Sequence, residues 1–290
     1  MSDKKNILIT GANGQLGMEF RAMAATFTGF EFIFVSKEEV SITDTDSIIA
    51  IFEMHDVFCC INCAAYTNVD KAETEKEKAF EINGTAVGQL ASICKKYKSH
   101  FFHFSTDYVF PGTASLPYKE TDPTDPVNIY GASKLEGEKQ AIEHNEGSVI
   151  IRTSWVYSSH GKNFVKTMLR LFRENTSVKV VNDQAGSPTY AGDLAFAVMQ
   201  IISTDYFIPG IYHFCNGGII SWHRFASEIK KLVSAECKIL PVTTDQFLTP
   251  AKRPRYSALD TSRIKDVFGV QVRGWEESLE KCLGMISKDA

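Results

Sequence analysis

Tyr130 and Lys134 are the residues of this 290-residue chain whose types and spacing most clearly suggest chemistry. A separation of four residues places two side chains on one face of a helix, one turn apart. A phenol ionises near pH ~10, and a neighbouring ammonium lowers that pKa because it favours the phenolate. The pair could therefore donate a proton to a carbonyl oxygen. The same spacing also occurs on the surface of ordinary helices, so it indicates a site only in the right structural context.

A glycine-rich turn near the N-terminus supplies part of that context. The apolar run Asn6–Thr10 predicts a strand, and the segment Gln15–Ala25 has the pattern of a helix. Between and within them, Gly11, Gly14 and Gly17 follow the spacing GxxGxxG. Glycines let a backbone approach a pyrophosphate, and the N–H groups at a helix start bind its charge. The turn predicts a dinucleotide site, with a purely structural turn as the alternative.

Length and composition restrict the classes of function. A chain of 290 residues with 44% hydrophobic content can bury a full core, in one compound domain or two. The formal net charge is −4 with no basic stripe, which argues against nucleic acid as the main partner. No apolar stretch reaches the roughly 18 residues of a membrane span. We therefore expect a cytoplasmic protein with no nucleic-acid partner and no membrane partner.

Cysteine and histidine spacing predicts neither a redox motif nor a metal site. The seven cysteines are an odd number and fall mostly in apolar segments, which suits a reducing compartment. Cys60 and Cys63 match CxxC, but they lie inside the strand-like run Val57–Ala65 and not before a helix, which favours core packing. The seven histidines show no paired ligand spacing.

Apolar runs alternate with helical patterns along the first half of the chain. Such alternation implies right-handed crossovers and a mainly parallel sheet. Ligands of such sheets collect beyond the carboxyl ends of the strands. The predicted strands are Glu31–Val35, Val57–Cys63, Phe101–Ser105 and Val149–Thr153, and the predicted helices are Asp46–Met54, Glu73–Tyr97 and Tyr130–His144.

These patterns predict an α/β fold with two parts. Residues 1–157 are expected to form a Rossmann-type domain with a doubly wound parallel sheet that binds NAD(P). Residues 158–290, where the alternation weakens, are expected to form a smaller C-terminal α+β substrate-binding lobe. Residues 187–217 are expected to return to the main sheet, with a helix at 192–202 and a strand at 210–214.

With these residues identified, the chain closely resembles the dTDP-4-dehydrorhamnose reductase family of the extended short-chain dehydrogenase/reductase superfamily. The resemblance covers nearly the whole length, and the ordered motifs are together highly specific. They are GANGQLG, CAAYTNVDKAE, STDYVFPG, YGASKLEGE, RTSWVY, NFVKTML, DQAGSPTY and KRPRYSALDT.

The resemblance implies NADPH-dependent reduction, with NADH as an alternative cofactor, of the C4 ketone of dTDP-4-dehydro-L-rhamnose. Tyr130 would donate the proton to the ketone oxygen, and Lys134 would lower the pKa of the phenol and hold ribose hydroxyls. Thr106 would hydrogen-bond the same oxygen as charge develops on it. Asp107 would orient sugar hydroxyls, with a loop cap as the alternative role.

The resemblance also implies the cofactor-binding residues. They are Gly11, Asn13, Gly14, Gln15, Leu16, Gly17, Ser36, Lys37, Ser41, Ile42, Ala64, Ala65, Tyr66 and Thr67, together with Tyr130 and Lys134. NAD-selective enzymes place an acidic residue at the end of the second strand, where this chain has Ser36 followed by Lys37. A 2′-phosphate would meet no carboxylate there, which favours NADPH. Glu38 and Glu39 follow directly and would oppose this preference if either turned inward.

For the dTDP-sugar, the resemblance implies contacts by Thr106 and Asp107, and by Val69, Trp155, Asn163 and Arg253. Arginine offers a planar fork for a diphosphate, and asparagine can donate to phosphate or sugar. Trp155 could equally be a core residue. Arg255 could take the place of Arg253. Alternatively, the run Lys252-Arg253-Pro254-Arg255 is a solvated basic segment that binds nothing.

Alternative functions stay open at this stage. One is a non-catalytic regulatory subunit like the β subunit of methionine adenosyltransferase, which shares much of the motif set. Another is a sugar-nucleotide epimerase or dehydratase; dehydratases place Asp-Glu beside the strand-end threonine, whereas here Tyr108 follows Asp107. A reductase that forms the C4 epimer is a third. The chain could also form a homodimer.

Overall fold

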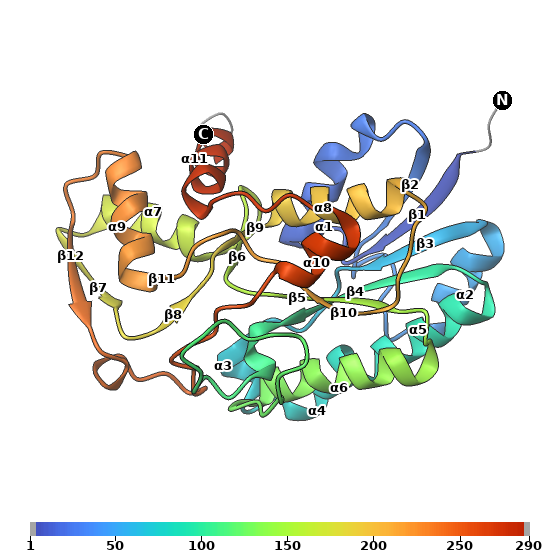
Figure 1. The fold of residues 1–290 in the computed structure, drawn as a ribbon, viewed down its shortest axis with the longest axis horizontal. Coiled ribbons are helices and arrows are strands. Elements are labelled where there is room, and N and C mark those ends of the chain that lie inside the picture. The colour runs from blue at the N-terminus through green and yellow to red at the C-terminus, as the bar shows by residue number, and fades with distance from the viewer. Residues whose placement is uncertain (1–3, 287–290) are drawn as a thin grey trace.

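A six-stranded parallel sheet forms the centre of the fold in the computed structural model, which describes residues 4–286 (Figure 1). The strand order is β10-β5-β4-β3-β1-β2, so the order reverses between β1 and β3. Such a reversal opens a crevice at the carboxyl ends of the two strands. The strands are β1 (Lys5–Thr10), β2 (Phe30–Val35), β3 (Val57–Asn62), β4 (His100–Thr106), β5 (Val149–Thr153) and β10 (Gly210–His213).

Helices cover both faces of this sheet (Figure 1). One face packs on α1 (Gln15–Met23), α8 (Ala191–Ser203) and α10 (Ser262–Phe268), and the other on α2 (Thr45–Met54), α5 (Ala86–Lys96) and α6 (Ile129–His144). Successive strand residues point to opposite faces. In β1, Ile7 and Ile9 accordingly join one core cluster and Leu8 joins the other. The α/β class predicted from the sequence is confirmed.

The helix predicted over Glu73–Tyr97 is interrupted. It consists of α4 (Lys76–Phe80), a π-helical segment at Glu81–Thr85 and α5, and a short α3 (Val69–Ala72) precedes it. The π-helical segment carries Asn83, whose Oδ1 accepts from the Tyr66 N–H at 2.8 Å and whose Nδ2 donates to the Ser133 hydroxyl at 2.9 Å. Extra residues in a helical turn are frequent at functional sites because they redirect a side chain.

A smaller lobe follows β5 in the chain and lies at the other end of the molecule (Figure 1). Its own core cluster includes Phe225, Trp275 and Leu279, with Tyr157 at the junction. No helix within residues 4–286 has the length and apolar character needed to cross a membrane. The lobe contains α7 (Phe164–Glu174), β7 (Ser177–Val181), β8 (Ala185–Gly186), β11 (Ile220–Ser221), α9 (Trp222–Leu232), β12 (Lys238–Val242) and α11 (Trp275–Ile286), and β6 (Val156–Tyr157) pairs with β9 (Thr189–Tyr190) beside it.

Two segments of the second half of the chain pack on the main sheet. Residues 191–213 supply α8 and β10, the latter paired in parallel with β5. Residues 262–268 form α10, whose Phe268 ring lies 4.9 Å from that of Tyr212 in β10. The sequence patterns indicated the first of these returns but not the second.

Helix α6 is fixed to the sheet by a buried ion pair. Arg152 of β5 donates from Nε and Nη2 to the two carboxylate oxygens of Glu138, at 2.8 and 2.7 Å. Both side chains are at most 3% exposed. The helix also approaches β4 and the π-helical segment so closely that only glycine fits at position 137. A Cβ there would lie 2.0 Å from the Asn83 carbonyl oxygen. The pair and the close contact together set the height of α6 above the sheet.

Arg152→Met should lower the free energy of unfolding by roughly 3–5 kcal/mol, because it leaves the Glu138 carboxylate buried without its partner. The measurement is urea denaturation at pH 7. Arg170→Met is the matched control, since Arg170 pairs with Glu174 at 2.6 Å where both side chains are more than half exposed. The control should change the free energy by less than about 1 kcal/mol. Equal losses in the two variants would contradict the role given to the buried pair.

Candidate active site

A cavity of about 900 Å³ opens where the sheet order reverses, at the carboxyl ends of β1, β3 and β4. Of the residues predicted to bind cofactor or substrate, most line this cavity. Those are Gly11, Asn13, Gly14, Gln15, Leu16, Lys37, Ser41, Ile42, Ala64, Ala65, Tyr66, Thr67, Val69, Thr106, Asp107, Tyr130, Lys134 and Trp155. Gly17, Ser36, Asn163 and Arg253 do not line it.

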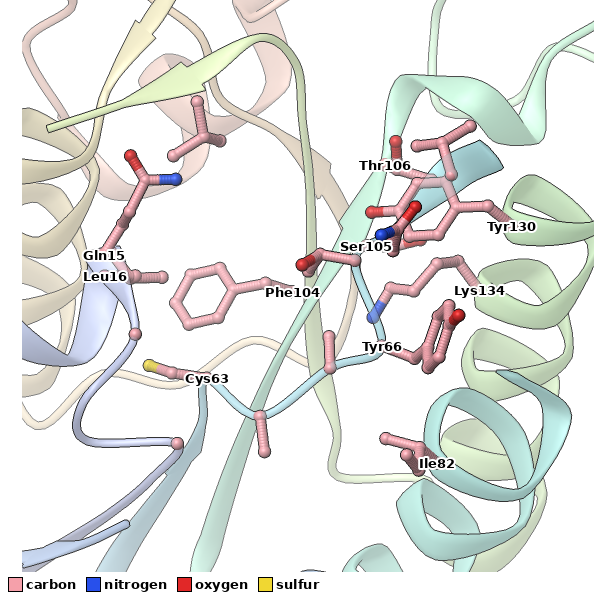
Figure 2. Close-up of a pocket in the computed structure, with 18 of the residues that line it drawn as sticks. Gln15, Leu16, Cys63, Tyr66, Ile82, Phe104, Ser105, Thr106, Tyr130 and Lys134 are labelled. Carbon is pink, nitrogen blue, oxygen red and sulfur yellow. The ribbon is translucent and has the colours of Figure 1, made fainter. Parts of the chain in front are cut away.

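The glycine-rich turn forms one wall of the cavity (Figure 2). Gly11 has φ +65°, and a Cβ there would lie 2.6 Å from the Ala64 backbone nitrogen of the loop after β3. Gly14 caps α1 with no side-chain hydrogen bond, so no side chain occupies the first N–H groups of this helix. Gly17 lies beneath the turn, where a Cβ would meet the Gly11 carbonyl oxygen at 2.6 Å. The backbone is thus arranged to receive an anionic group closely.

The residues after β2 separate into two roles. Ser36 is 4% exposed, and its backbone N–H donates to the Glu39 carboxylate at 2.8 Å, so Glu39 folds back onto the turn. That hydrogen bond lowers the pKa of Glu39. Lys37 and Glu38 line the cavity, and Glu38 accepts a hydrogen bond from Asn13 Nδ2 at 3.4 Å. The cavity wall here therefore carries one cation and one carboxylate.

Tyr130, Thr106 and Lys134 lie together on the other wall (Figure 2). Burial raises the pKa of Tyr130 to about 12, and the Asp107 carboxylate acts in the same direction, against a hydrogen bond with Thr106. The net shift runs opposite to the lowering expected from Lys134, which is not among its causes. The phenol therefore carries its proton at neutral pH.

Asp107 and Thr106 share one hydrogen bond. The Thr106 hydroxyl donates to Asp107 Oδ1 at 2.9 Å and accepts from the Tyr108 N–H at 3.2 Å. Burial raises the pKa of Asp107 to about 7, and hydrogen bonds with Ser257 and Thr106 oppose the rise. Its Oδ2 is buried with no hydrogen-bond partner in the described residues. The carboxyl group therefore keeps its proton to a higher pH than an ordinary aspartate does.

Lys134 is buried in α6, one turn beyond Tyr130, and its side chain is 2% exposed. Burial lowers the pKa of its amine to about 8, while Glu138 acts in the opposite direction. Its Nζ lies 3.2 Å from His103 Nε2. Phenol, carboxyl and amine in this wall are all shifted toward their neutral forms, and burial is the largest cause for each.

Three residues predicted to contact substrate have other partners in this structure. Asn163 caps α7 through Oδ1 and donates from Nδ2 to Gln15 Oε1 at 2.9 Å. Arg253 makes a two-pronged ion pair with Asp70 of α3, at 3.1 and 3.0 Å. Trp155, with φ +48°, stacks on Trp222 of α9 with ring centroids 3.5 Å apart, and both rings line the cavity.

Several residues that organise the site were not singled out from the sequence. Asn62 and His103 are polar residues on buried strands and connect the loop after β3 to Lys134. Asn83 connects that loop to α6. A polar residue inside an otherwise apolar strand run, as in VFCCIN and HFFHFST, was the available signal.

Within residues 4–286, no group of three or more His, Cys, Asp or Glu side chains is placed to hold a metal ion.

Comparison with known proteins gives a consistent family. A family described as the RmlD substrate binding domain matches residues 5–287. The spore coat polysaccharide biosynthesis protein SpsK of Bacillus subtilis is 42% identical over 277 residues, which are 96% of each chain. The dTDP-4-dehydrorhamnose reductase of Burkholderia thailandensis is 38% identical over 96% of this chain and 97% of its own.

Solved structures agree in fold. The dTDP-4-dehydrorhamnose reductase of Bacillus anthracis, solved in complex with NADP, superposes with a TM-score of 0.93 at 36% identity, over 98% of this chain and 100% of its own. A dehydratase from Streptomyces venezuelae with NAD superposes with a TM-score of 0.82 over 98% and 97% of the chains, but at 15% identity it shows the fold alone.

Asp107→Asn should change how stability depends on pH. The folded-state pKa of about 7 lies above the unfolded value of about 3.9, so the native state of the wild type loses stability as pH rises from 4 to 7. Between pH 5 and pH 8 the variant should lose roughly 2–3 kcal/mol less unfolding free energy than the wild type. Urea denaturation at the two pH values measures this difference.

Asp44→Asn is the control for that measurement. Asp44 caps α2, and its pKa is lowered by hydrogen bonds from Ser47, so it stays ionised in both states between pH 5 and pH 8. Its variant should lose stability in parallel with the wild type over that range. A parallel loss in Asp107→Asn would show that the carboxyl group titrates near its ordinary pKa.

Proposed function

The chain belongs to the RmlD substrate binding domain family, and from this membership and the geometry of the cavity we propose that it is a dTDP-4-dehydrorhamnose reductase. The reaction is NADPH-dependent reduction of the C4 ketone of dTDP-4-dehydro-L-rhamnose to dTDP-L-rhamnose, the last step of dTDP-rhamnose biosynthesis. One observation carries the proposal. A proton-donating phenol and a glycine-rich anion cradle face each other across a single cavity (Figure 2).

The residues present fit a dinucleotide. The turn at Gly11 and Gly14 leaves its backbone uncovered by side chains, and a Cβ at Gly11 would collide with the loop after β3. We assign the pyrophosphate to the N-terminus of α1, and the adenosine ribose to the wall formed by Lys37 and Glu38. NADPH is the proposed cofactor, with NADH as the weaker alternative. When bound, it supplies the hydride for the ketone carbon.

Tyr130 supplies the proton that balances the hydride. Its phenol is protonated at neutral pH, as an ordinary tyrosine is, and burial raises its pKa further, so the O–H is present to be donated as negative charge develops on the ketone oxygen. The Thr106 hydroxyl donates to Asp107 and must turn to reach the same oxygen. When Asp107 is protonated, its free Oδ2 can itself donate to a sugar oxygen.

The nucleotide half of the substrate is assigned to the side of the cavity near the smaller lobe. Trp155 and Trp222 present an aromatic pair there. Arg253 is the proposed partner of the diphosphate, although it is held by Asp70 before substrate arrives. Binding of the diphosphate would therefore exchange one anionic partner of Arg253 for another.

We also propose that the enzyme acts in the cytoplasm. All seven cysteines are free thiols, and six of them are buried, as suits a protein of a reducing compartment. No observation favours the regulatory-subunit alternative. A dehydratase structure and an epimerase structure that superpose on this chain are 15% and 18% identical and support only the shared fold.

Tyr130→Phe should lower kcat by several orders of magnitude and leave the affinity for NADPH nearly unchanged, because only the proton donor is removed. The assay follows NADPH absorbance with dTDP-4-dehydro-L-rhamnose, and NMR identifies the sugar formed. Tyr97→Phe is the control, since Tyr97 is a tyrosine of α5's C-terminal end whose hydroxyl donates to Glu53. Full turnover in Tyr130→Phe would assign the acid to another group, and the C4 epimer as product would overturn the proposed stereochemistry.

Glu38→Gln should raise the preference for NADPH over NADH by about fivefold in kcat/KM, because it removes a carboxylate from the wall assigned to the 2′-phosphate. Steady-state kinetics with both cofactors measures the ratio. Glu31→Gln removes the same charge from the exposed start of β2 and should leave the ratio unchanged. An equal change for both cofactors would place the 2′-phosphate away from Glu38.

A further inference from the structure

Four buried polar side chains form a continuous hydrogen-bonded chain from the sheet to the active-site amine. The Thr10 hydroxyl donates to Asn62 Oδ1 at 2.8 Å, Asn62 Nδ2 lies 3.1 Å from His103 Nδ1, and His103 Nε2 lies 3.2 Å from Lys134 Nζ. The first three side chains come from the neighbouring strands β1, β3 and β4, and the fourth from α6. Each of the four is at most 2% exposed.

The direction of the hydrogen bonds is fixed at Asn62. The Ala64 backbone N–H lies 3.1 Å from Asn62 Oδ1 and can only donate, so the atom facing it must be the amide oxygen. The other end of the amide is then the NH₂ group, which donates to His103 Nδ1. His103 Nδ1 must therefore be unprotonated.

His103 consequently carries its proton on Nε2. Burial, together with the nearby Lys134, holds the pKa of His103 well below its usual value, so the ring is neutral and has a single N–H. With Nδ1 acting as an acceptor, that N–H points at the Lys134 amine. An ammonium has three donors and no acceptor, so it cannot form a hydrogen bond with this N–H. A neutral amine accepts it through its lone pair.

We propose that His103, oriented by Asn62, is a positioning residue that stabilises the neutral amine form of Lys134 and so lets Lys134 return a proton to Tyr130 after each reduction. The inference rests on the proposed function. Tyr130 gives its O–H proton to the ketone oxygen and becomes phenolate. The Lys134 ammonium then gives one proton to a bridging water or hydroxyl group in the cavity, which passes its own proton to the phenolate. Lys134 becomes an amine, which accepts from His103 Nε2–H. Solvent that enters the cavity reprotonates the amine.

The other charged groups around Lys134 do not replace His103 in this role. Glu138, on the same helix, favours the ammonium, but both of its oxygens are held by Arg152 of β5. On the cavity side, Lys134 lies with Tyr66 of the loop after β3 and with Tyr130 (Figure 2), and the Tyr66 hydroxyl donates to Glu75. His103 is the titratable partner within hydrogen-bond distance of Nζ among the described residues.

The first test is the tautomer of His103 in the wild-type protein. Protein labelled with ¹⁵N-histidine is studied by long-range ¹H–¹⁵N NMR between pH 7 and pH 9, and the His103 signals are assigned with His103→Asn. The expected result is a protonated Nε2 and an unprotonated Nδ1. A protonated Nδ1 would overturn the proposal. Because no substrate is added, absence of ketosugar reduction would overturn the proposed function separately.

The second test reverses the direction of the hydrogen bonds between Asn62, His103 and Lys134. Asn62→Asp keeps the shape and still accepts from Ala64 and Thr10, but its second oxygen now requires a proton on His103 Nδ1. Nε2 then becomes an acceptor for the ammonium. The tautomer should switch, and the pKa of Lys134, followed through its ¹³Cε signal and assigned with Lys134→Met, should rise by about one unit or more.

Asn145→Asp is the matched control, because Asn145 is also buried but follows the far end of α6. It should leave both the tautomer and the pKa of Lys134 unchanged. A rise in the pKa of Lys134 in Asn62→Asp without a change of tautomer would overturn the proposal, since the new carboxylate alone would explain it. A change of tautomer that leaves the pKa of Lys134 unchanged would also overturn it.

Discussion

The buried ion pair between Arg152 and Glu138 fixes the helix that carries Tyr130 and Lys134. Each of its two hydrogen bonds joins α6 to β5, and the pair lies one turn beyond Lys134. A charged pair at 3% exposure is stable only when both partners are present. This requirement fixes the distance between α6 and the sheet. The approach of Gly137 to the Asn83 carbonyl sets the same distance from a second direction.

Burial has a common consequence for the ionisable groups that this arrangement brings together. It raises the pKa of Tyr130 and Asp107 and lowers that of Lys134. Each shift favours the neutral form, so Tyr130 and Asp107 hold their protons more tightly than ordinary side chains do, and the Lys134 ammonium gives up its proton more readily. The pKa values of Asp107 and Lys134 thereby come close together, while that of Lys134 falls well below that of Tyr130, so proton transfer from the Lys134 ammonium to a Tyr130 phenolate is downhill.

The sequence predicted the parts of this arrangement that depend on local pattern. The strands, the glycine turn and the helix at Tyr130 follow from apolar periodicity and from the conformational freedom of glycine. The π-helical segment at Glu81–Thr85 did not follow, because its cause is a tertiary contact of Asn83 with the loop after β3. The folding back of Glu39 and the capture of Arg253 by Asp70 likewise depend on distances that spacing alone does not contain.

The direction of the Tyr130 pKa shift shows most clearly why the electrostatics of the site do not follow from the sequence. The spacing of Tyr130 and Lys134 gives a through-space effect of known sign, a lowering of the phenol pKa. That sign assumes a charged amine. In the folded protein the amine lies against His103, which is itself held as a donor by Asn62 and Ala64, and burial outweighs the effect of charge at the phenol. The charge on Lys134 is thus a property of the three strands beneath it, and the spacing of two residues on a helix cannot determine it.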